Sequence, residues 1–250
     1  MGHQPVRGRL SRVEFRDVVR RRRMVRNYDP DRPVPPEVVE RLLAHAVRAP
    51  SAGFSQGWGF LVLERAADRE RFWAATSPRG RLNPEPGAER PARIVPASGA
   101  EASGASQPGG PEGQGMSGWL AGMSRAPLLV VAHSNRAAYL DRYAEPDKGW
   151  TDRDPGRWPA PYWDIDAGFA SLLMLLTAVD EGLGACFFGL PPERVAGYRE
   201  EFGVPADFAP IGAITVGYPA PDRRSPSLKR GQRPPDQVIH RGHWTGHRAR

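Results

Sequence analysis

Apolar residues at helical spacing mark the first clear element of the chain. Val38, Leu42 and Ala46 recur at i and i+4, which places them on one face of a helix. The helix begins after Pro35 and ends before Pro50, because the residue before a proline avoids helical dihedrals. The pattern predicts one amphipathic helix over this stretch.

A second segment, residues 166–181, is apolar around most of its circumference. A helix with this pattern must be buried, either in the core or between subunits. Gly182 follows it at the position of a C-terminal cap. The longest apolar stretch lies within residues 168–179 and is too short and too interrupted to cross a bilayer, so we expect no membrane segment.

Shorter patterns predict the remaining elements. The predicted strands are residues 59–64, 127–133, 185–189 and 211–217, with a further short strand at 237–240. The other predicted helices are residues 11–22, 67–76 and 192–202. The first begins with the capping-box pair Ser11 and Glu14, and the last ends at Gly203. Helices and strands mix without a regular βαβα order, which predicts an α+β fold.

Residues 83–118 depart from this periodic pattern. Half of these 36 residues are Pro, Gly or Ser. Such a composition cannot bury enough apolar surface to offset the entropy of ordering the chain. We therefore expect a disordered insertion or lid at about residues 80–118. It interrupts a single domain over residues 11–250, which follows a flexible N-terminus at residues 1–10 and ends in a C-terminal arm at about residues 219–250.

Composition narrows the function classes. The single Cys186 excludes an internal disulfide, and the six His show no spacing typical of a metal site, so we expect no metal. The sequence has no signal-peptide pattern, and we expect a cytoplasmic protein.

The whole net charge of +7 lies in residues 1–26, where nine Arg stand against the two acidic residues Glu14 and Asp17. The neutral remainder offers no extended basic face, which disfavours nucleic-acid binding.

The basic excess centres on an arginine cluster, residues 20–26. Arg22, Arg23 and Arg26 follow the first predicted helix. Guanidinium groups present forked donors that match phosphate oxygens, so two or three of them at close spacing are typical of a phosphate site. The alternative is a solvated basic helix end that complements the helix dipole. Charge alone does not separate the two interpretations.

Two further segments carry candidate chemistry. The loop Ala49–Trp58 is rich in small residues, which let backbone N–H groups approach a flat polar ring, and Ser51, Ser55 and Gln56 add donors and acceptors. The alternative is a plain turn from helix to strand. The segment Gly182–Leu190 opens with Gly-Leu-Gly, which can simply end a helix and is not a dinucleotide fingerprint.

Together the three segments resemble the nitroreductase family of flavoproteins. The family pattern is Arg-Arg-Ser-x-Arg-x-Tyr/Phe, then Ala-Pro-Ser-x-x-x-x-Gln-Pro-Trp, then Gly-Leu-Gly-x-Cys. It corresponds in order and spacing to Arg22–Tyr28, Ala49–Trp58 and Gly182–Cys186. The basic tail Lys229–Pro234 is also similar to the C-terminal segment of the family. The resemblance covers about residues 11–75 and 120–245.

Two positions depart from the family pattern. Met24 replaces the usual Ser, which removes one hydroxyl contact to phosphate but leaves the backbone N–H. Gly57 replaces the usual Pro, which loosens its loop. Neither change removes a charge.

The resemblance implies a nitroreductase-like α+β fold, with a mostly antiparallel sheet flanked by helices, and an intertwined homodimer with two FMN sites at the subunit interface. It implies no catalytic side chain, because flavin N5 performs the chemistry. The implied cofactor-binding residues are Arg22, Arg23, Met24, Lys229, Arg230 and Arg233 at the phosphate, Arg26 near N1 and O2, Pro50, Ser51, Ala52, Gly53 and Gln56 at the ring of the partner's flavin, and Phe188 and Gly189 facing N5.

Residues 139–163 are rich in aromatic residues, and we expect a long functional loop there. Within it, Tyr143, Trp158, Tyr162 and Trp163 are candidates to cover a substrate that stacks on the flavin. Alternatively, these rings anchor the loop or lie at an interface.

The activity implied by the resemblance is hydride transfer from NADH or NADPH through FMN to a small organic acceptor, such as a nitroaromatic, a quinone or a biosynthetic intermediate. The alternatives are a flavin-dependent dehydrogenase or oxidase of a pathway intermediate, and a flavin-sequestering protein with little turnover.

Overall fold

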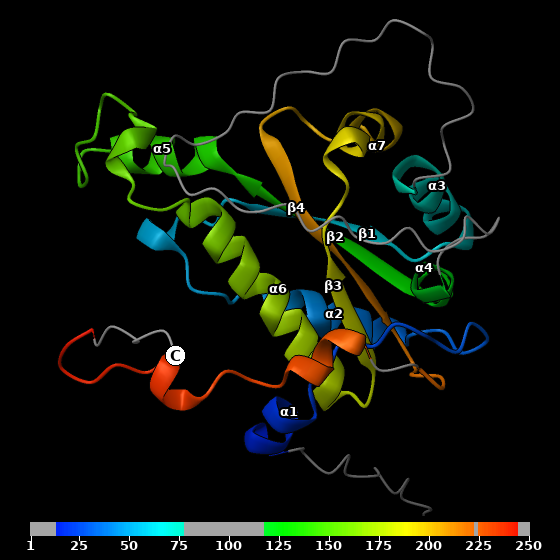
Figure 1. Cartoon of the computed structure of the whole chain (residues 1–250). Coiled ribbons are helices and arrows are strands. Elements are labelled where there is room, and N and C mark those ends of the chain that lie inside the picture. The colour runs from blue at the N-terminus through cyan, green and yellow to red at the C-terminus, as the bar shows by residue number, and fades with distance from the viewer. Residues whose placement is uncertain (1–13, 78–117, 223–224, 245–250) are drawn as a thin grey trace, which may run out of the picture.

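A computed structural model describes residues 14–77, 118–222 and 225–244. The expected flexible N-terminus, Ser11 of the capping box and nearly all of the low-complexity insertion lie outside the described residues. Within these ranges the chain forms an α+β fold in which helices cover both faces of one sheet (Figure 1).

The sheet has four strands in the order β1-β2-β4-β3, and every neighbouring pair is antiparallel. The strands are β1 (Trp58–Leu63), β2 (Leu128–Asn135), β3 (Gly184–Phe188) and β4 (Phe208–Gly217). All eight residues of β2 are buried, as expected for a central strand covered on both faces. The four predicted strands are confirmed.

Seven α-helices surround the sheet within the described ranges: α1 (Phe15–Arg21), α2 (Pro36–Ala46), α3 (Ala66–Thr76), α4 (Gly118–Met123), α5 (Arg136–Ala144), α6 (Tyr162–Asp180) and α7 (Val195–Phe202). Successive residues of a strand point to opposite faces, so β2 contributes to two core clusters. Leu128 and Val130 pack with α2 and α6, whereas Leu129 and Val131 pack with α3, α4 and α7.

Residues 139–163 are not one long loop, so that prediction was wrong. Residues 136–144 form α5, which Asn135 caps by accepting a hydrogen bond from the Ala138 N–H at 3.1 Å. Tyr139 of α5 is fully buried. The many aromatic residues here pack α5 against the loop that follows it. Residue composition alone does not distinguish such a packed helix from a surface loop.

The short strand predicted at residues 237–240 does not form. Pro235–Gln237 make a 3-10 turn instead, and the N–H groups of residues 237–239 donate to the Pro234 and Pro235 carbonyls within this turn, so they are not available to a strand ladder. The long apolar helix begins at Tyr162, four residues before the predicted start, because Pro161 marks its beginning more strongly than the first apolar residue does.

Helix α6 is buried on one side only. Ala167, Ala170 and Met174 face the core, but Phe169 and Leu172 are 43% and 45% exposed. By length and composition α6 could cross a membrane, although the shorter apolar stretch in the sequence suggested otherwise. A core helix passes the same test, and half of the apolar part of α6 is buried inside the fold. The exposed half is an apolar stripe that the described part of the chain does not cover.

Candidate active site

The arginine segment, residues 22–28, leaves the end of α1 and runs along the edge strand β3. Met24 pairs with Ala185 in a parallel bridge, and the Val25 N–H donates to the Ala185 carbonyl at 3.0 Å. A Cβ atom at Gly184 would lie 2.6 Å from the Val25 side chain. The second glycine of the Gly-Leu-Gly motif therefore allows this close approach, which joins the third motif physically to the first.

Tyr28 fixes the far end of the arginine segment. Its ring is fully buried, and its hydroxyl donates to the Val25 carbonyl at 2.7 Å and lies 2.9 Å from Oγ1 of Thr215 in β4. Burial raises the pKa of Tyr28 far above its ordinary value, so the phenol stays a hydrogen-bond donor. The backbone that carries Arg22, Arg23 and Arg26 is thereby held to the sheet.

A cavity of about 1150 Å³ opens beside Arg26. Four segments line it: Arg26 and Asn27; the end of α4, with Ala121, Gly122, Met123 and the following Arg125; Cys186–Phe188 of β3; and Pro221, Asp222, Ser225 and Pro226 of the C-terminal arm. Burial raises the pKa of the Cys186 thiol, although Arg26 opposes this effect, so the thiol forms a neutral wall. The structure thus brings Arg26 and Phe188, two of the residues that the resemblance assigns to the flavin, to one cavity.

The cavity already holds a carboxylate of the chain itself. Oδ2 of Asp222 accepts the Arg26 N–H at 2.9 Å and lies 3.7 Å from the Arg23 guanidinium. The guanidinium groups of Arg22 and Arg26 have no carboxylate partner in the part of the chain that the structure describes. The arginine segment therefore binds one oxyanion and has cationic groups left for another.

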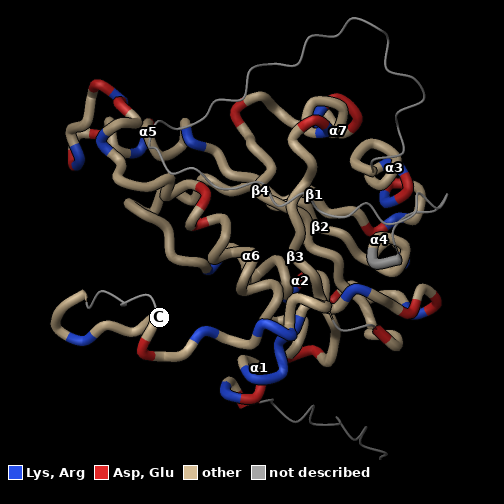
Figure 2. The backbone as a smooth tube through the Cα atoms, in the orientation of Figure 1, with Lys and Arg blue, Asp and Glu red and all other residues tan. Residues whose placement is uncertain are grey.

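The basic tail starts at the same cavity. Ser225 and Pro226 line it, and the 3-10 turn Pro226–Arg230 carries Lys229 and Arg230 into solvent, followed by Arg233. Figure 2 shows Lys and Arg gathered on α1 and along this tail, on the same side of the molecule.

The segment Ser51–Gln56, which the resemblance assigns to the flavin ring and which we therefore call the flavin loop, has an irregular backbone. A 3-10 turn spans Ala52–Phe54, and Gly53, Phe54 and Gln56 have φ of 61°, 57° and 51°. Oγ of Ser51 accepts the Gln56 N–H at 2.8 Å, so this side chain is used within the loop. Left-handed backbone at two non-glycine residues is typical of a functional segment.

The arginine segment and the flavin loop lie at opposite ends of α6. The loop contacts Asp166 near the beginning of the helix, whereas Arg23 shares a small pocket with Val179 and Gly182 at its end. At 1.5 Å per residue these ends are about 20 Å apart. One chain therefore does not bring the two groups of predicted flavin ligands together.

The four predicted substrate residues form one aromatic cluster. The ring of Trp158 lies at its centre, with centroids 4.5 Å from Tyr143, 5.5 Å from Tyr162 and 6.2 Å from Trp163. The Tyr143 ring packs so closely on Gly53 that a Cβ atom there would lie 2.6 Å from it. This packing favours the interpretation that the rings anchor their loop.

Residue patterns did not reveal several polar groups around the flavin loop and the cavity. They are Tyr139, Arg142, Asp166 and Asp222. Asp166 did carry a signal, because a carboxylate within an otherwise apolar buried helix must be hydrogen bonded. Tyr139 lay in the aromatic-rich stretch expected to cover a substrate, but its role as a hydrogen-bond donor had no signal, and neither did Arg142 or Asp222, because these contacts are remote in sequence.

Comparison with known proteins agrees with this architecture. The model of the nitroreductase family matches residues 19–218. A relative from Methanothermobacter thermautotrophicus, named "Putative NADH dehydrogenase/NAD(P)H nitroreductase", is 25% identical over 215 residues, which is 85% of this chain and 81% of that protein.

Solved structures share the fold. A nitroreductase family protein from Streptococcus pneumoniae has a TM-score of 0.58 at 16% identity, covering 91% of this chain and all of that one. A "putative nitroreductase in complex with FMN" from Exiguobacterium sibiricum has a TM-score of 0.55 at 18% identity, covering 89% and 98%. With the family match over residues 19–218, the chain belongs to the nitroreductase family.

Proposed function

We propose that this chain is an FMN-dependent oxidoreductase that passes hydride from NADH or NADPH through the flavin to a small organic acceptor, such as a nitroaromatic, a quinone or a biosynthetic intermediate. Family membership supports the reaction class. The observation that carries the proposal is the oxyanion site, where Arg23 and the Arg26 N–H hold a carboxylate beside the guanidinium groups of Arg22 and Arg26, which have no carboxylate partner among the described residues. A flavin phosphate is the oxyanion that this chemistry fits.

The cavity is compatible with FMN in size and in charge. Its volume is about that of a pocket for a large organic ligand. Under this proposal Arg22, Arg23 and the Met24 N–H hold the phosphate, with Lys229, Arg230 and Arg233 from the tail. Arg26 would neutralise negative charge at N1 and O2 of the bound flavin, and the backbone of Phe188 and Gly189 would lie towards N5. The flavin supplies the redox chemistry when bound, and the protein supplies binding, orientation and electrostatics.

We propose a homodimer, because a second copy would complete the site. The apolar stripe of α6 consists of the exposed Phe169 and Leu172, flanked by the half-buried Ile165 and Leu176, at the spacing of one helix face. If two α6 helices pack antiparallel along this stripe, the flavin loop of one subunit meets the arginine segment of the other. Pro50, Ser51, Ala52, Gly53 and Gln56 then contact the flavin held by the partner. A two-fold axis places two such sites in the dimer.

We place the acceptor at the exposed edge of the aromatic cluster. Tyr162 is the exposed member, whereas Trp158 and Trp163 are partly buried behind it and Tyr143 packs on the flavin loop. A planar acceptor that stacks on the flavin would meet this edge. We also propose that the protein acts in the cytoplasm.

A spectrum tests the proposed function. The purified protein, reconstituted with FMN if necessary, is expected to be yellow and to bleach within seconds when NADH or NADPH is added without oxygen. Sedimentation is expected to give a dimer, and the Leu172→Arg variant is expected to lose both the dimer and the flavin. A colourless protein that cannot be reconstituted would refute the proposal. A yellow protein that neither nucleotide reduces would indicate another donor or flavin storage.

A further inference from the structure

We propose that Asp166 and Arg142 are positioning residues, which hold the flavin loop from its two sides in the conformation that meets the flavin ring. The ring contact rests on the function proposed above, but the mechanical role of the two side chains does not. Neither residue belongs to the three sequence motifs.

The flavin loop needs external support because its backbone is strained. Left-handed dihedrals at non-glycine residues cost on the order of 1–3 kcal/mol each and persist only when surrounding structure fixes them. Phe54 and Gln56 are such residues, and the Phe54 side chain is exposed, so its own packing within the chain does not supply the support.

Asp166 supports the loop from the side of α6. It is 3% exposed, and its Oδ2 accepts the Ala52 N–H at 2.8 Å and the Tyr139 hydroxyl at 2.7 Å. Oγ of Ser51 lies 3.3 Å from the same hydroxyl and accepts the Gln56 N–H. Burial raises the pKa of Tyr139, so its hydroxyl remains a donor to the carboxylate. The hydrogen bonds thus run from one buried carboxylate to the last residue of the loop.

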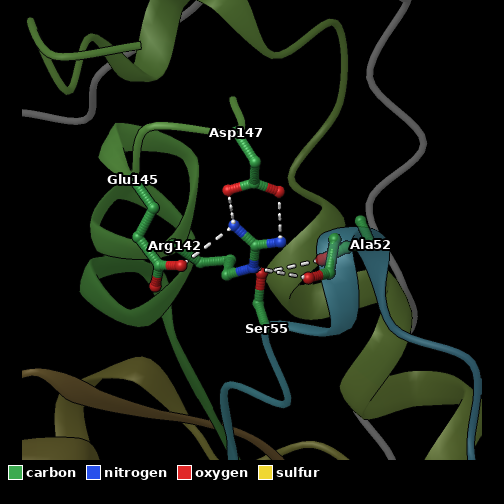
Figure 3. Close-up of polar contacts among 6 residues, drawn as sticks. Ala52, Ser55, Arg142, Glu145 and Asp147 are labelled. Carbon is green, nitrogen blue, oxygen red and sulfur yellow. Dashed lines mark hydrogen bonds and ion pairs between the residues drawn. The ribbon is translucent and has the colours of Figure 1, made fainter. Parts of the chain in front are cut away.

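Arg142 supports the loop from the side of α5. Its Nε donates to the Gly53 carbonyl at 2.9 Å, while its terminal nitrogens bind Asp147 at 2.7 and 2.8 Å and Glu145 at 3.1 Å (Figure 3). The side chain is only 24% exposed. Two carboxylates therefore fix the plane of the guanidinium, and this orients the donor that reaches the loop.

The two supports bracket Gly53, the first left-handed residue of the loop. One holds the N–H that precedes it and the other holds its own carbonyl, while the Tyr143 ring closes the space behind it. The loop backbone is left with little freedom, and its remaining groups on the outer side keep a constant geometry. A contact made by backbone groups gains affinity from such preorganisation.

Amide hydrogen exchange of the full-length protein without added flavin tests the support itself. Asp166→Ala is expected to raise exchange at residues 52–56 by about tenfold or more, because a hydrogen bond to a charged group is lost. Asp166→Asn, which keeps a carbonyl acceptor, is expected to restore most of the protection. Asp164→Ala is the matched control, because Asp164 lies in the same helical turn but accepts a hydrogen bond from Ser134 instead.

Arg142→Met is expected to raise exchange at the same residues, whereas Arg157→Met is the control, since Arg157 pairs with Asp152 in the neighbouring loop and does not contact the flavin loop. FMN titration then tests the functional consequence. Asp166→Ala and Arg142→Met are each expected to raise the dissociation constant for FMN about tenfold. Both are also expected to shift the reduction potential of the bound flavin. The thermal midpoint of Arg142→Met should be close to that of Arg157→Met.

Wild-type exchange at residues 52–56 in Arg142→Met, together with exchange in Asp166→Ala no different from that in Asp164→Ala, would overturn the positioning role. A wild-type protein that never binds FMN would refute the proposed function instead, and the exchange data would still decide the positioning role.

Discussion

The arginine segment and the flavin loop differ in how their backbones are held in place. In residues 22–28 the backbone has no left-handed residue and is held by main-chain pairing to β3 and by the buried Tyr28, so the guanidinium groups of Arg22 and Arg26 are available to a ligand, while that of Arg23 lies near Asp222. In residues 51–56 the backbone is irregular and is held by side chains from α5 and α6. One region displays side chains on a regular frame, and the other displays its backbone.

This difference explains which ligand group each region suits. A phosphate needs charge, and long cationic side chains supply it from a simple extended segment. A flat ring with polar edges needs N–H and carbonyl groups at close range, and only an irregular backbone with small residues supplies them. The irregular conformation in turn requires the remote residues that fix it.

The largest effect is expected from removing the charge of the arginine segment. Arg22→Ala together with Arg26→Ala is expected to weaken FMN binding by roughly 100-fold or more, because two charge-assisted contacts are lost. The thermal midpoint should change little, since neither guanidinium has an internal carboxylate partner among the described residues. Fluorescence titration of the apoprotein measures the affinity, with His243→Ala as the control. Equal affinity in the two variants would refute the assignment of the arginine segment to the flavin.

The next effect belongs to the flavin loop and should appear as instability. Gly53→Ala adds a Cβ atom 2.6 Å from the Tyr143 ring at a residue with φ of 61°. We expect a loss of about 1–3 kcal/mol from strain and overpacking. Gly197→Ala is the control, because Gly197 lies in α7 with open space around it. Chemical denaturation measures both, and a Gly53→Ala variant as stable as wild type would contradict the account of the loop.

A smaller effect is expected at the frame of the arginine segment. Tyr28→Phe keeps the buried ring but removes the hydroxyl that bonds to Val25 and Thr215. The free energy of unfolding should fall by about 1 kcal/mol, with a modest loss of FMN affinity as Arg26 becomes less fixed. A loss of affinity as large as that of the double arginine variant would show that the frame, and not the charge, dominates binding.

The smallest expected effect is a pH dependence of stability, and it arises in the sheet, at His133 of β2, outside both regions. His133 is buried beside Tyr198, and burial lowers the pKa of His133 below its ordinary value. The unfolded chain therefore binds a proton below about pH 6.5 that the folded chain does not, so stability falls as the pH drops. From pH 7 to pH 6 the loss should not exceed about 0.7 kcal/mol. Thermal midpoints against pH measure it, and His133→Gln should flatten the slope.

The sequence predicted the regular elements well because hydrophobic spacing determines them. The four strands and the helices at 36–46 and 195–202 lie where periodicity and caps indicate. The arginine segment was also recognisable, since its charges are local. The aromatic residues of α5 were misread as a loop, because a short helix packed against an aromatic loop lacks a simple polar–apolar period. The buried carboxylate of Asp166 indicated that it must have a hydrogen-bond donor, but the sequence did not show that the donor is the Ala52 N–H of the flavin loop, which is remote in sequence.

Ala52 and Asp166 are separated by 114 positions in the sequence. A contact of such high contact order forms only after most of the chain has been brought together. The shape of the flavin loop is therefore a property of the assembled fold, and an excised peptide of residues 49–58 would not retain it. For the same reason, any opening that separates the start of α6 from α2 would release this loop while the sheet is still paired, making it a sensitive reporter of partial unfolding.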